Sequence, residues 1–207
     1  FGKLICASNS NKILYDFFET GVYDRRREFY TTISPSMDIL ISSNLERLLS
    51  MVAGNENCER WMKDLFEKGI FSVDDNIKSL LGKDFKGCYA NENQTKLTIK
   101  RYFEEFGYLV DPHTAVALFS ADSYEKETDS NKKTIVVSTA SPYKFSNAVL
   151  ESLDENIPAD DFEALEKLQS ISGMKIPETL SSLKSFEKRF STVVEKENIK
   201  ERVLEFA

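Results

Sequence analysis

The alternation of apolar runs and polar breaks along the chain predicts strands separated by helices. Short apolar runs at 4–7, 85–90 and 108–110 are too short for helices, and the β-branched run Ile135-Val136-Val137 indicates a buried strand. Between these runs the apolar residues recur at helical spacing, as in Phe145, Val149 and Leu153. Strands that alternate with helices are typical of a parallel sheet covered by helices. The chain is therefore predicted to have an α/β fold.

Helix start and stop signals give the same picture. Gly21, Gly54, Gly69 and Gly107 each follow an apolar helical pattern, as expected for residues that end helices. Ser43-Asn-Leu-Glu46 is predicted to be a capping box, and the acidic pairs 74–75 and 160–161 are expected to cap helices rather than to act as acid–base pairs. A turn is expected at 129–131. Helices are also expected to begin at Pro177-Glu178 and to span 195–206.

The pattern divides the chain into two predicted domains. Residues 1–155 contain the four candidate strands, which form a partial parallel or mixed sheet flanked by helices, with a helical insertion at about 31–82. Residues 156–207 form a helical carboxyl-terminal extension. The chain enters a buried strand almost at once and has no initiator methionine, so we expect it to be a piece of a larger protein.

Composition narrows the classes of function. The 207 residues carry a formal net charge of −7 and no basic stripe with interleaved aromatics, which disfavours a nucleic-acid partner or an anionic membrane surface. No apolar run approaches the ~20 residues that span a bilayer. Three scattered cysteines and one histidine provide no zinc-ligand spacing, so no metal site is expected. Reduced thiols and a cytoplasmic location are the simplest interpretation.

Polar residues follow three of the predicted strands. Asn9, His113 and Thr139 each stand at or just beyond a strand's carboxyl end, where open α/β sheets bind ligands. Ser141-Pro142 has the pattern of a helix N-cap followed by proline at the first helical position. Lys144 lies in the first turn of that helix, against the dipole preference. It is either a solvated lysine or part of an anion site with the free N–H groups of that turn.

These segments resemble the carboxyl-terminal half of the threonine synthase family. The resemblance is carried by 4–11, by Ser34-Pro-Ser-Met-Asp-Ile39 with 42–47, by Asp111-Pro-His-Thr114 with 115–117, and by 138–145. It covers about residues 1–155 and weakens through Ile176-Pro177. The resemblance implies the type II fold of pyridoxal-phosphate enzymes and the conversion of O-phospho-L-homoserine and water into L-threonine and phosphate.

The resemblance also implies roles for single residues. Thr139 matches the hydroxyl residue that faces the pyridine nitrogen of the cofactor, and His113 and Thr114 match a segment that lines the cofactor pocket. Asn9 and Asn11 face the same pocket, while Lys144 and Ser141 are candidates for substrate or phosphate binding. The Schiff-base lysine and the glycine-rich phosphate loop of the family have no counterpart in this sequence, so no catalytic residue is assigned here.

Three expectations and two alternatives follow. The 207-residue piece is expected to be inactive, to bind pyridoxal phosphate weakly at best, and to associate with itself, as a dimer or otherwise. A threonine-synthase-like phospholyase, which would release phosphate but yield a keto acid, is not distinguished by this sequence. A non-catalytic module for assembly or regulation is the alternative from another class.

Overall fold

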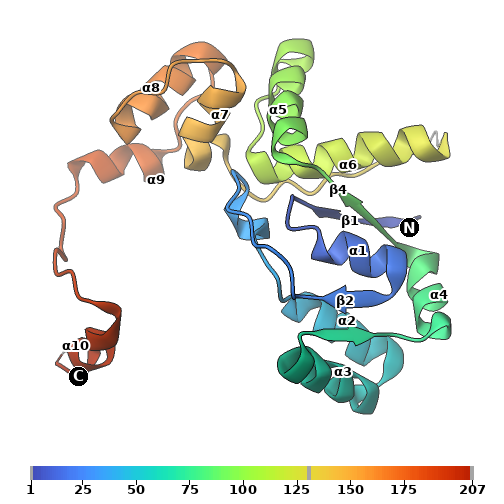
Figure 1. Cartoon of the computed structure of the whole chain (residues 1–207). Coiled ribbons are helices and arrows are strands. Elements are labelled where there is room, and N and C mark those ends of the chain that lie inside the picture. The colour runs from blue at the N-terminus through green and yellow to red at the C-terminus, as the bar shows by residue number, and fades with distance from the viewer. Residues whose placement is uncertain (1, 130–131, 206–207) are drawn as a thin grey trace. The chain divides into compact units, whose positions relative to one another are not determined.

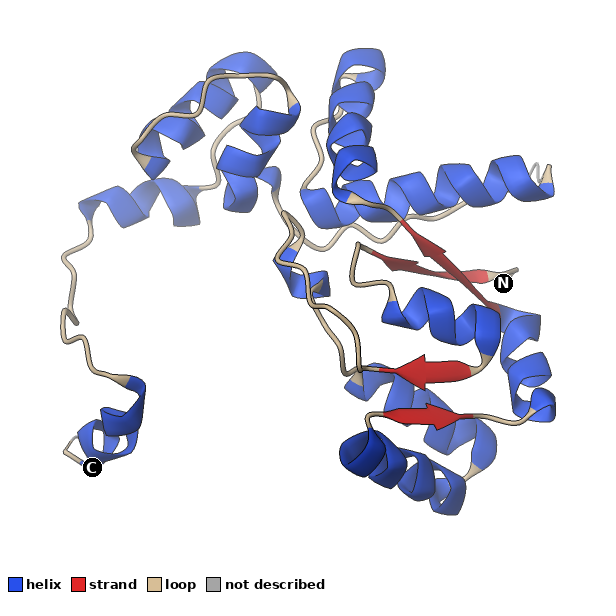
Figure 2. Ribbon diagram, in the orientation of Figure 1, coloured by secondary structure: helices blue, strands red, loops and turns tan. Residues whose placement is uncertain are grey.

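The computed structural model describes residues 2–129 and 132–205, in which contacts group the chain into two units. The first unit comprises Phe1–Met174 and the second Lys175–Ala207. Figure 1 follows the chain through both units, and Figure 2 colours it by secondary structure. Because the two units are separate, each is described by itself below.

The central sheet of the first unit is parallel, as the sequence predicts. Strand β1 (Leu4–Ser8) pairs with β4 (Phe85–Tyr89), in a register that runs from Leu4 opposite Phe85 to Ser8 opposite Tyr89. Helix α1 (Ile13–Thr20) packs against this pair from one side, and α6 (Pro112–Thr128) lies on the other side (Figure 1). Coverage by helices on both faces is what makes a short parallel pair stable.

A second, antiparallel pair was not expected from the sequence. Strand β2 (Val22–Asp24) pairs with β3 (Ile70–Ser72). Each strand has three residues and follows a glycine in the left-handed conformation, Gly21 or Gly69, which ends the helix before it. Runs this short carry no detectable periodicity. Tyr23 and Phe71 stack across the pair with ring centroids 5.3 Å apart, so aromatic packing holds these strands together.

The predicted helical insertion lies around this second pair. Helices α2 (Ser43–Ala53), α3 (Asn55–Lys68) and α4 (Asp75–Asp84) contribute apolar faces to a core that also includes α1. Asp74 caps α4 as predicted. The predicted capping box at Ser43 is wrong, because Ser42 is the N-cap and its hydroxyl accepts from the Leu45 amide at 3.3 Å. The buried members of this core are Ile13, Phe17, Tyr23, Leu45, Leu49, Cys58, Trp61, Leu65, Phe71 and Leu81.

Helices make up the rest of the first unit. Helix α5 (Glu92–Phe106) begins at an Asn91 capping box, and it packs on α6 and on α7 (Ser146–Ser152). A 3-10 turn, η2 (Pro142–Phe145), leads into α7. Helix α8 (Asp161–Ser172), capped by Asp160 as predicted, packs on α7 within the same unit. The first unit extends to Met174 and so includes α8. The domain boundary expected near residue 155 stays a prediction.

Two predicted strands are not strands in this structure. Residues 108–110 and 135–137 have no regular secondary structure. Leu109 and Val110 are buried nevertheless, whereas Ile135 and Val137 are 80% and 73% exposed, so the prediction of a buried strand there is wrong. A β-branched run favours extended backbone, but a strand also needs a hydrogen-bonded neighbour. Within the described ranges, neither segment has one.

The second unit consists of short helices. It contains α9 (Glu178–Ser181), the 3-10 turns η3 (Ser182–Ser185) and η4 (Lys196–Asn198), and α10 (Ile199–Leu204). The helix predicted at 195–206 thus forms as η4 and α10, and its end at Phe206 lies outside the described residues. The turn predicted at 129–131 lies partly outside them too; Asp129 itself has φ 48°, in the left-handed region.

Candidate functional site

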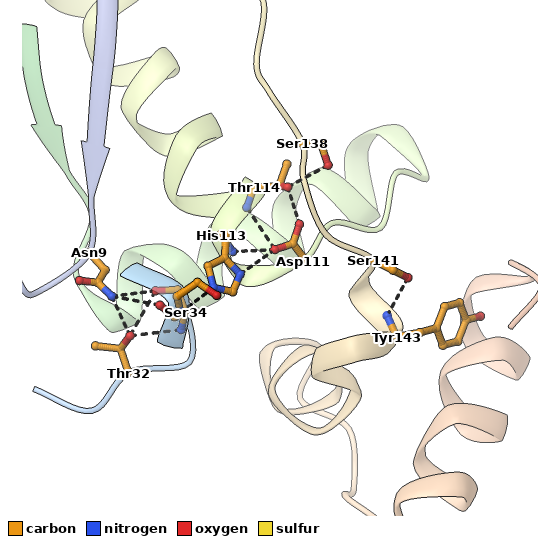
Figure 3. Close-up of polar contacts among 10 residues, drawn as sticks. Asn9, Thr32, Ser34, Asp111, His113, Thr114, Ser138, Ser141 and Tyr143 are labelled. Atoms are coloured by element: carbon orange, nitrogen blue, oxygen red, sulfur yellow. Dashed lines mark hydrogen bonds and ion pairs between the residues drawn. The ribbon is translucent and has the colours of Figure 1, made fainter. Parts of the chain in front are cut away.

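Asn9 directly follows strand β1 and ties it to a distant loop. Its side chain is buried, and Nδ2 lies 2.8 Å from Thr32 Oγ1, 3.0 Å from Ser34 Oγ and 2.7 Å from Asp38 Oδ1 (Figure 3). Its Oδ1 accepts from the Asn11 amide at 2.9 Å. Asn9 therefore fixes residues 32–38, called the 32–38 loop below, at the end of the central sheet.

Asn11 holds the segment just before this loop. Its Nδ2 donates to the Tyr30 carbonyl at 2.8 Å and to Asp38 Oδ1 at 3.0 Å, and its Oδ1 accepts from the Tyr30 amide at 2.9 Å. Both polar atoms of the side chain are engaged inside the protein. The predicted contact of Asn9 and Asn11 with a cofactor stays a prediction. In the structure, both side chains hold residues 30–38 against the end of strand β1.

Asp38 is the hub of the 32–38 loop, and sequence reasoning missed it. Its carboxylate accepts from Asn9, from Asn11, and from both the amide (2.9 Å) and the hydroxyl (2.7 Å) of Thr32. The loop contains the 3-10 turn η1 (Pro35–Met37). The available signal was the density of short polar residues, which bond the backbone locally instead of forming regular elements. That signal predicts a structured loop but not its partners.

Glu92 supports the same loop from the start of α5. Both carboxylate oxygens face the Ile33 amide, at 3.2 and 3.4 Å. Burial raises the pKa of Glu92, although the Ile33 N–H group opposes that shift. The base of the loop is thus held by carboxylates on two sides, with Asp38 inside the loop and Glu92 outside it.

Asp111 caps α6 and is almost fully buried, with 1% of its surface exposed. Its Oδ1 accepts from the His113 amide (2.9 Å), from His113 Nδ1 (2.9 Å) and from the Thr114 amide (3.4 Å), and its Oδ2 accepts from the Thr114 hydroxyl. Burial alone would raise the pKa of Asp111, but the hydrogen bonds from His113 and Thr114 outweigh it and hold that pKa below the usual range. Asp111 is therefore an ionised N-cap.

His113 connects α6 to the 32–38 loop. Its Nδ1 faces Asp111, and its Nε2 accepts from the Ser36 amide at 3.1 Å. The Phe145 ring, from η2, lies 4.8 Å from the imidazole, centroid to centroid. Two of the three strand-end segments predicted to converge, those of Asn9 and His113, are thus joined through one loop.

The third segment reaches the site through Ser138. The Ser138 hydroxyl lies 2.9 Å from the Thr114 hydroxyl, which itself bonds Asp111 (Figure 3). Thr139, the residue singled out by the sequence, is exposed, and its hydroxyl makes no hydrogen bond to any described residue. The structure therefore brings the three segments together, with Ser138 as the anchor and Thr139 as the exposed neighbour.

The remaining candidates lie at η2. The Ser141 hydroxyl accepts from the Tyr143 amide at 3.3 Å and is the N-cap, as predicted (Figure 3). Lys144 is exposed to solvent. Its exposure favours the interpretation as a solvated lysine over an anion site. The four-residue turn η2 is also too short to provide a substantial helix dipole.

The described residues contain no group of three residues suited to hold a metal ion, and no helix among them is long and apolar enough to cross a membrane. Cys6, Cys58 and Cys88 are free thiols, and burial raises the pKa of Cys6 to about 11. A thiol with so high a pKa is unreactive at neutral pH.

Comparison with known proteins agrees with the resemblance found in the sequence. A family model described as "Threonine synthase, C-terminal" matches residues 114–203. Threonine synthase of Saccharomyces cerevisiae is 35% identical over 191 residues, which cover 84% of this chain and 37% of that protein. The crystal structure of the yeast enzyme matches 98% of this chain with a TM-score of 0.79 and 34% identity. This chain is homologous to the carboxyl-terminal region of threonine synthases.

Two further relatives widen the comparison. A structure of PLP-bound threonine synthase from Brucella melitensis matches 98% of the chain, with a TM-score of 0.77 and 28% identity. The human protein named threonine synthase-like 1 is 38% identical over 156 residues, which cover 73% of this chain and 20% of that protein. The chain spans well under half the length of the threonine synthases it matches, 37% of the yeast protein and 40% of the Brucella chain.

Proposed function

We propose that this chain is the carboxyl-terminal part of a pyridoxal-phosphate-dependent lyase, a threonine synthase that converts O-phospho-L-homoserine and water into L-threonine and phosphate. The observation that carries the proposal is the match to yeast threonine synthase over 98% of the chain at 34% identity. The Brucella relative, whose structure contains PLP, supports the choice of cofactor. The three free cysteines support a cytoplasmic location.

The residues present fit one end of this cofactor. Thr139 offers an exposed hydroxyl without a partner among the described residues, beside a rigid polar network, and would hold the pyridine nitrogen. Asn9, Asn11, His113 and Thr114 are engaged with the protein and would support the pocket wall. The bound cofactor would supply an electron sink for proton removal next to the substrate amine. Within that scheme, the residues of this chain would orient the cofactor and enclose it.

The 207-residue chain alone is proposed to be inactive. It has no segment that matches the family's Schiff-base lysine motif or its glycine-rich phosphate loop. Mixing the purified chain with pyridoxal phosphate should therefore produce no new visible absorption band and no phosphate release from O-phosphohomoserine. A clear band from a covalently bound cofactor would show that a lysine of this chain takes that role.

The decisive experiment uses the full-length protein with pyridoxal phosphate and O-phosphohomoserine, following phosphate and threonine together. Equal release of both is the expected result. Phosphate without threonine would instead identify the phospholyase, the second candidate. Release of neither product would favour the third interpretation, a non-catalytic module for assembly or regulation.

Thr139 can be tested in the same assay. Thr139→Ala should weaken pyridoxal phosphate binding and lower kcat, because the pyridine nitrogen loses its hydrogen-bond partner. Thr134→Ala is the matched control, since Thr134 lies in the same irregular segment and its hydroxyl bonds the Glu125 carboxylate, at 2.6 Å. Equal effects of the two substitutions would remove Thr139 from the site.

We also propose that the isolated chain associates with itself. Ile135 and Val137 are exposed on an extended segment, and apolar extended backbone without a neighbour invites pairing with a second copy. Sedimentation should show association that rises with concentration and is weakened by Val137→Asp. Met51→Asp, at an equally exposed apolar position on α2, should leave it unchanged. A monomer at high concentration would contradict the proposal.

A further inference from the structure

His113, the only histidine of the chain, lies where three segments meet. It is 8% exposed and contacts α6 through Asp111, the 32–38 loop through the Ser36 amide, and η2 through the Phe145 ring. Both ring nitrogens are therefore occupied by the protein. A side chain in this position has no polar atom left to offer a ligand.

The direction of each hydrogen bond around the ring is determined by its partners. Asp111 is ionised and can only accept, so the ring proton lies on Nδ1. The Ser36 N–H group can only donate, so Nε2 must present its lone pair. The imidazole is thus neutral, in the Nδ1–H tautomer. A second proton on Nε2 would place two N–H groups face to face and abolish the bond to Ser36.

The 32–38 loop is held firmly at its base and lightly at its tip. Thr32, Ile33, Ser34 and Asp38 bond Asn9, Asn11 or Glu92. The tip, Pro35–Ser36, is exposed, and within the described chain the Ser36 amide bond to His113 is what joins it to another segment. Losing that single bond would release the tip while the base stays in place.

We propose that His113 is a positioning residue that latches the tip of the 32–38 loop against the start of α6. Asp111 holds the imidazole through Nδ1, and the Phe145 ring of η2 packs against it, so that Nε2 faces the Ser36 amide of the loop. If the proposed function holds, loss of this latch would loosen one wall of the cofactor pocket.

The first test uses the whole 207-residue chain with ¹⁵N-labelled histidine, which yields the signals of one imidazole only. At about pH 8 we expect the Nδ1–H tautomer, with Nε2 as the acceptor of the Ser36 amide. An Nε2–H tautomer would overturn the proposal.

A matched pair of variants separates the two ring nitrogens. His113→Gln places an acceptor near the position of Nε2, so the Ser36 amide should stay protected. His113→Asn keeps a donor toward Asp111 but no acceptor for Ser36, so exchange of that amide should be about 10-fold faster than in the wild type at the same pH, the effect of one lost hydrogen bond. Equal exchange in both variants would refute the latch. These readouts involve neither cofactor nor turnover, so they are independent of whether the protein makes threonine.

Discussion

At the scale of single residues, Asp111 shows how one buried carboxylate organises the candidate site. It caps α6 and receives donors from both His113 and Thr114, and through Thr114 it reaches Ser138. Two segments, the start of α6 and the segment of Ser138, thus depend on one side chain. A buried charge with this many partners is stabilising only while every partner is present.

Asp111→Asn should lower the free energy of unfolding by about 2 to 3 kcal/mol, because charge-assisted bonds are lost and an amide N–H group faces donors. Asp160→Asn is the control. Asp160 is an exposed N-cap that accepts from Phe162 and Glu163 amides, and asparagine caps helices as well as aspartate. It should change the free energy by less than about 0.5 kcal/mol. Similar denaturation midpoints for both variants would contradict this account.

Asp111 also makes stability depend on pH. Because its pKa is lower in the folded protein than in the unfolded chain, its contribution is fully present above the unfolded value, about 3.9, and is lost as the pH falls through the folded value. The difference in unfolding free energy between the wild type and Asp111→Asn should therefore be constant near neutrality and shrink below about pH 4. Urea unfolding of both proteins at a series of pH values measures this difference in free energy. A difference that grows as the pH falls would contradict the prediction.

At the scale of elements, close approach of backbones positions the site. Strand β4 lies so near α1 that a Cβ atom on Gly87 would meet Tyr15 Cα at 2.9 Å and the Tyr15 carbonyl oxygen at 3.0 Å. These are backbone atoms, which cannot rotate away. Glycine at 87 therefore sets the spacing between α1 and the sheet, and with it the place of Asn9 and Asn11, which link β1 to α1.

Gly87→Ala should destabilise the protein by about 1 to 3 kcal/mol, the usual cost of overpacking. Gly82→Ala provides the opposite control, since a Cβ atom there meets nothing within 4 Å and Gly82 lies inside helix α4. It should stabilise the protein by about 0.5 to 1 kcal/mol through helix propensity. Thermal unfolding of the two variants should thus shift in opposite directions, and a neutral Gly87→Ala would show that α1 can move.

At the scale of the whole molecule, the second unit, Lys175–Ala207, contains a stretch that is open to proteases. Residues 186–195 lie within it; they have no regular secondary structure and are exposed. They include Lys188 and Arg189. Such segments are where proteases cut first.

Limited trypsin digestion should therefore cut first at Lys188 or Arg189 and leave a larger product that contains α8. Lys133 should be cut more slowly, because its segment is tethered by Thr134 to Glu125 and by Ser138 to Thr114. Replacing both Lys188 and Arg189 by glutamine should delay the first cut. A first cut at Lys144 or Lys167, the tryptic sites that flank residue 155, would support the domain boundary predicted from sequence over the one seen in the contacts.

The sequence alone determined several helix ends, the parallel character of the central sheet and the family resemblance, because caps, glycines and apolar periodicity act locally. It also indicated that the segments of Asn9, His113 and Thr139 converge. Only the tertiary structure decided how they meet: through Asp38, Ser36 and Ser138, whose partners lie 24 to 77 residues away. It also decided that 135–137 is extended and exposed, because a strand forms only where another strand offers hydrogen bonds, and no local pattern specifies that neighbour.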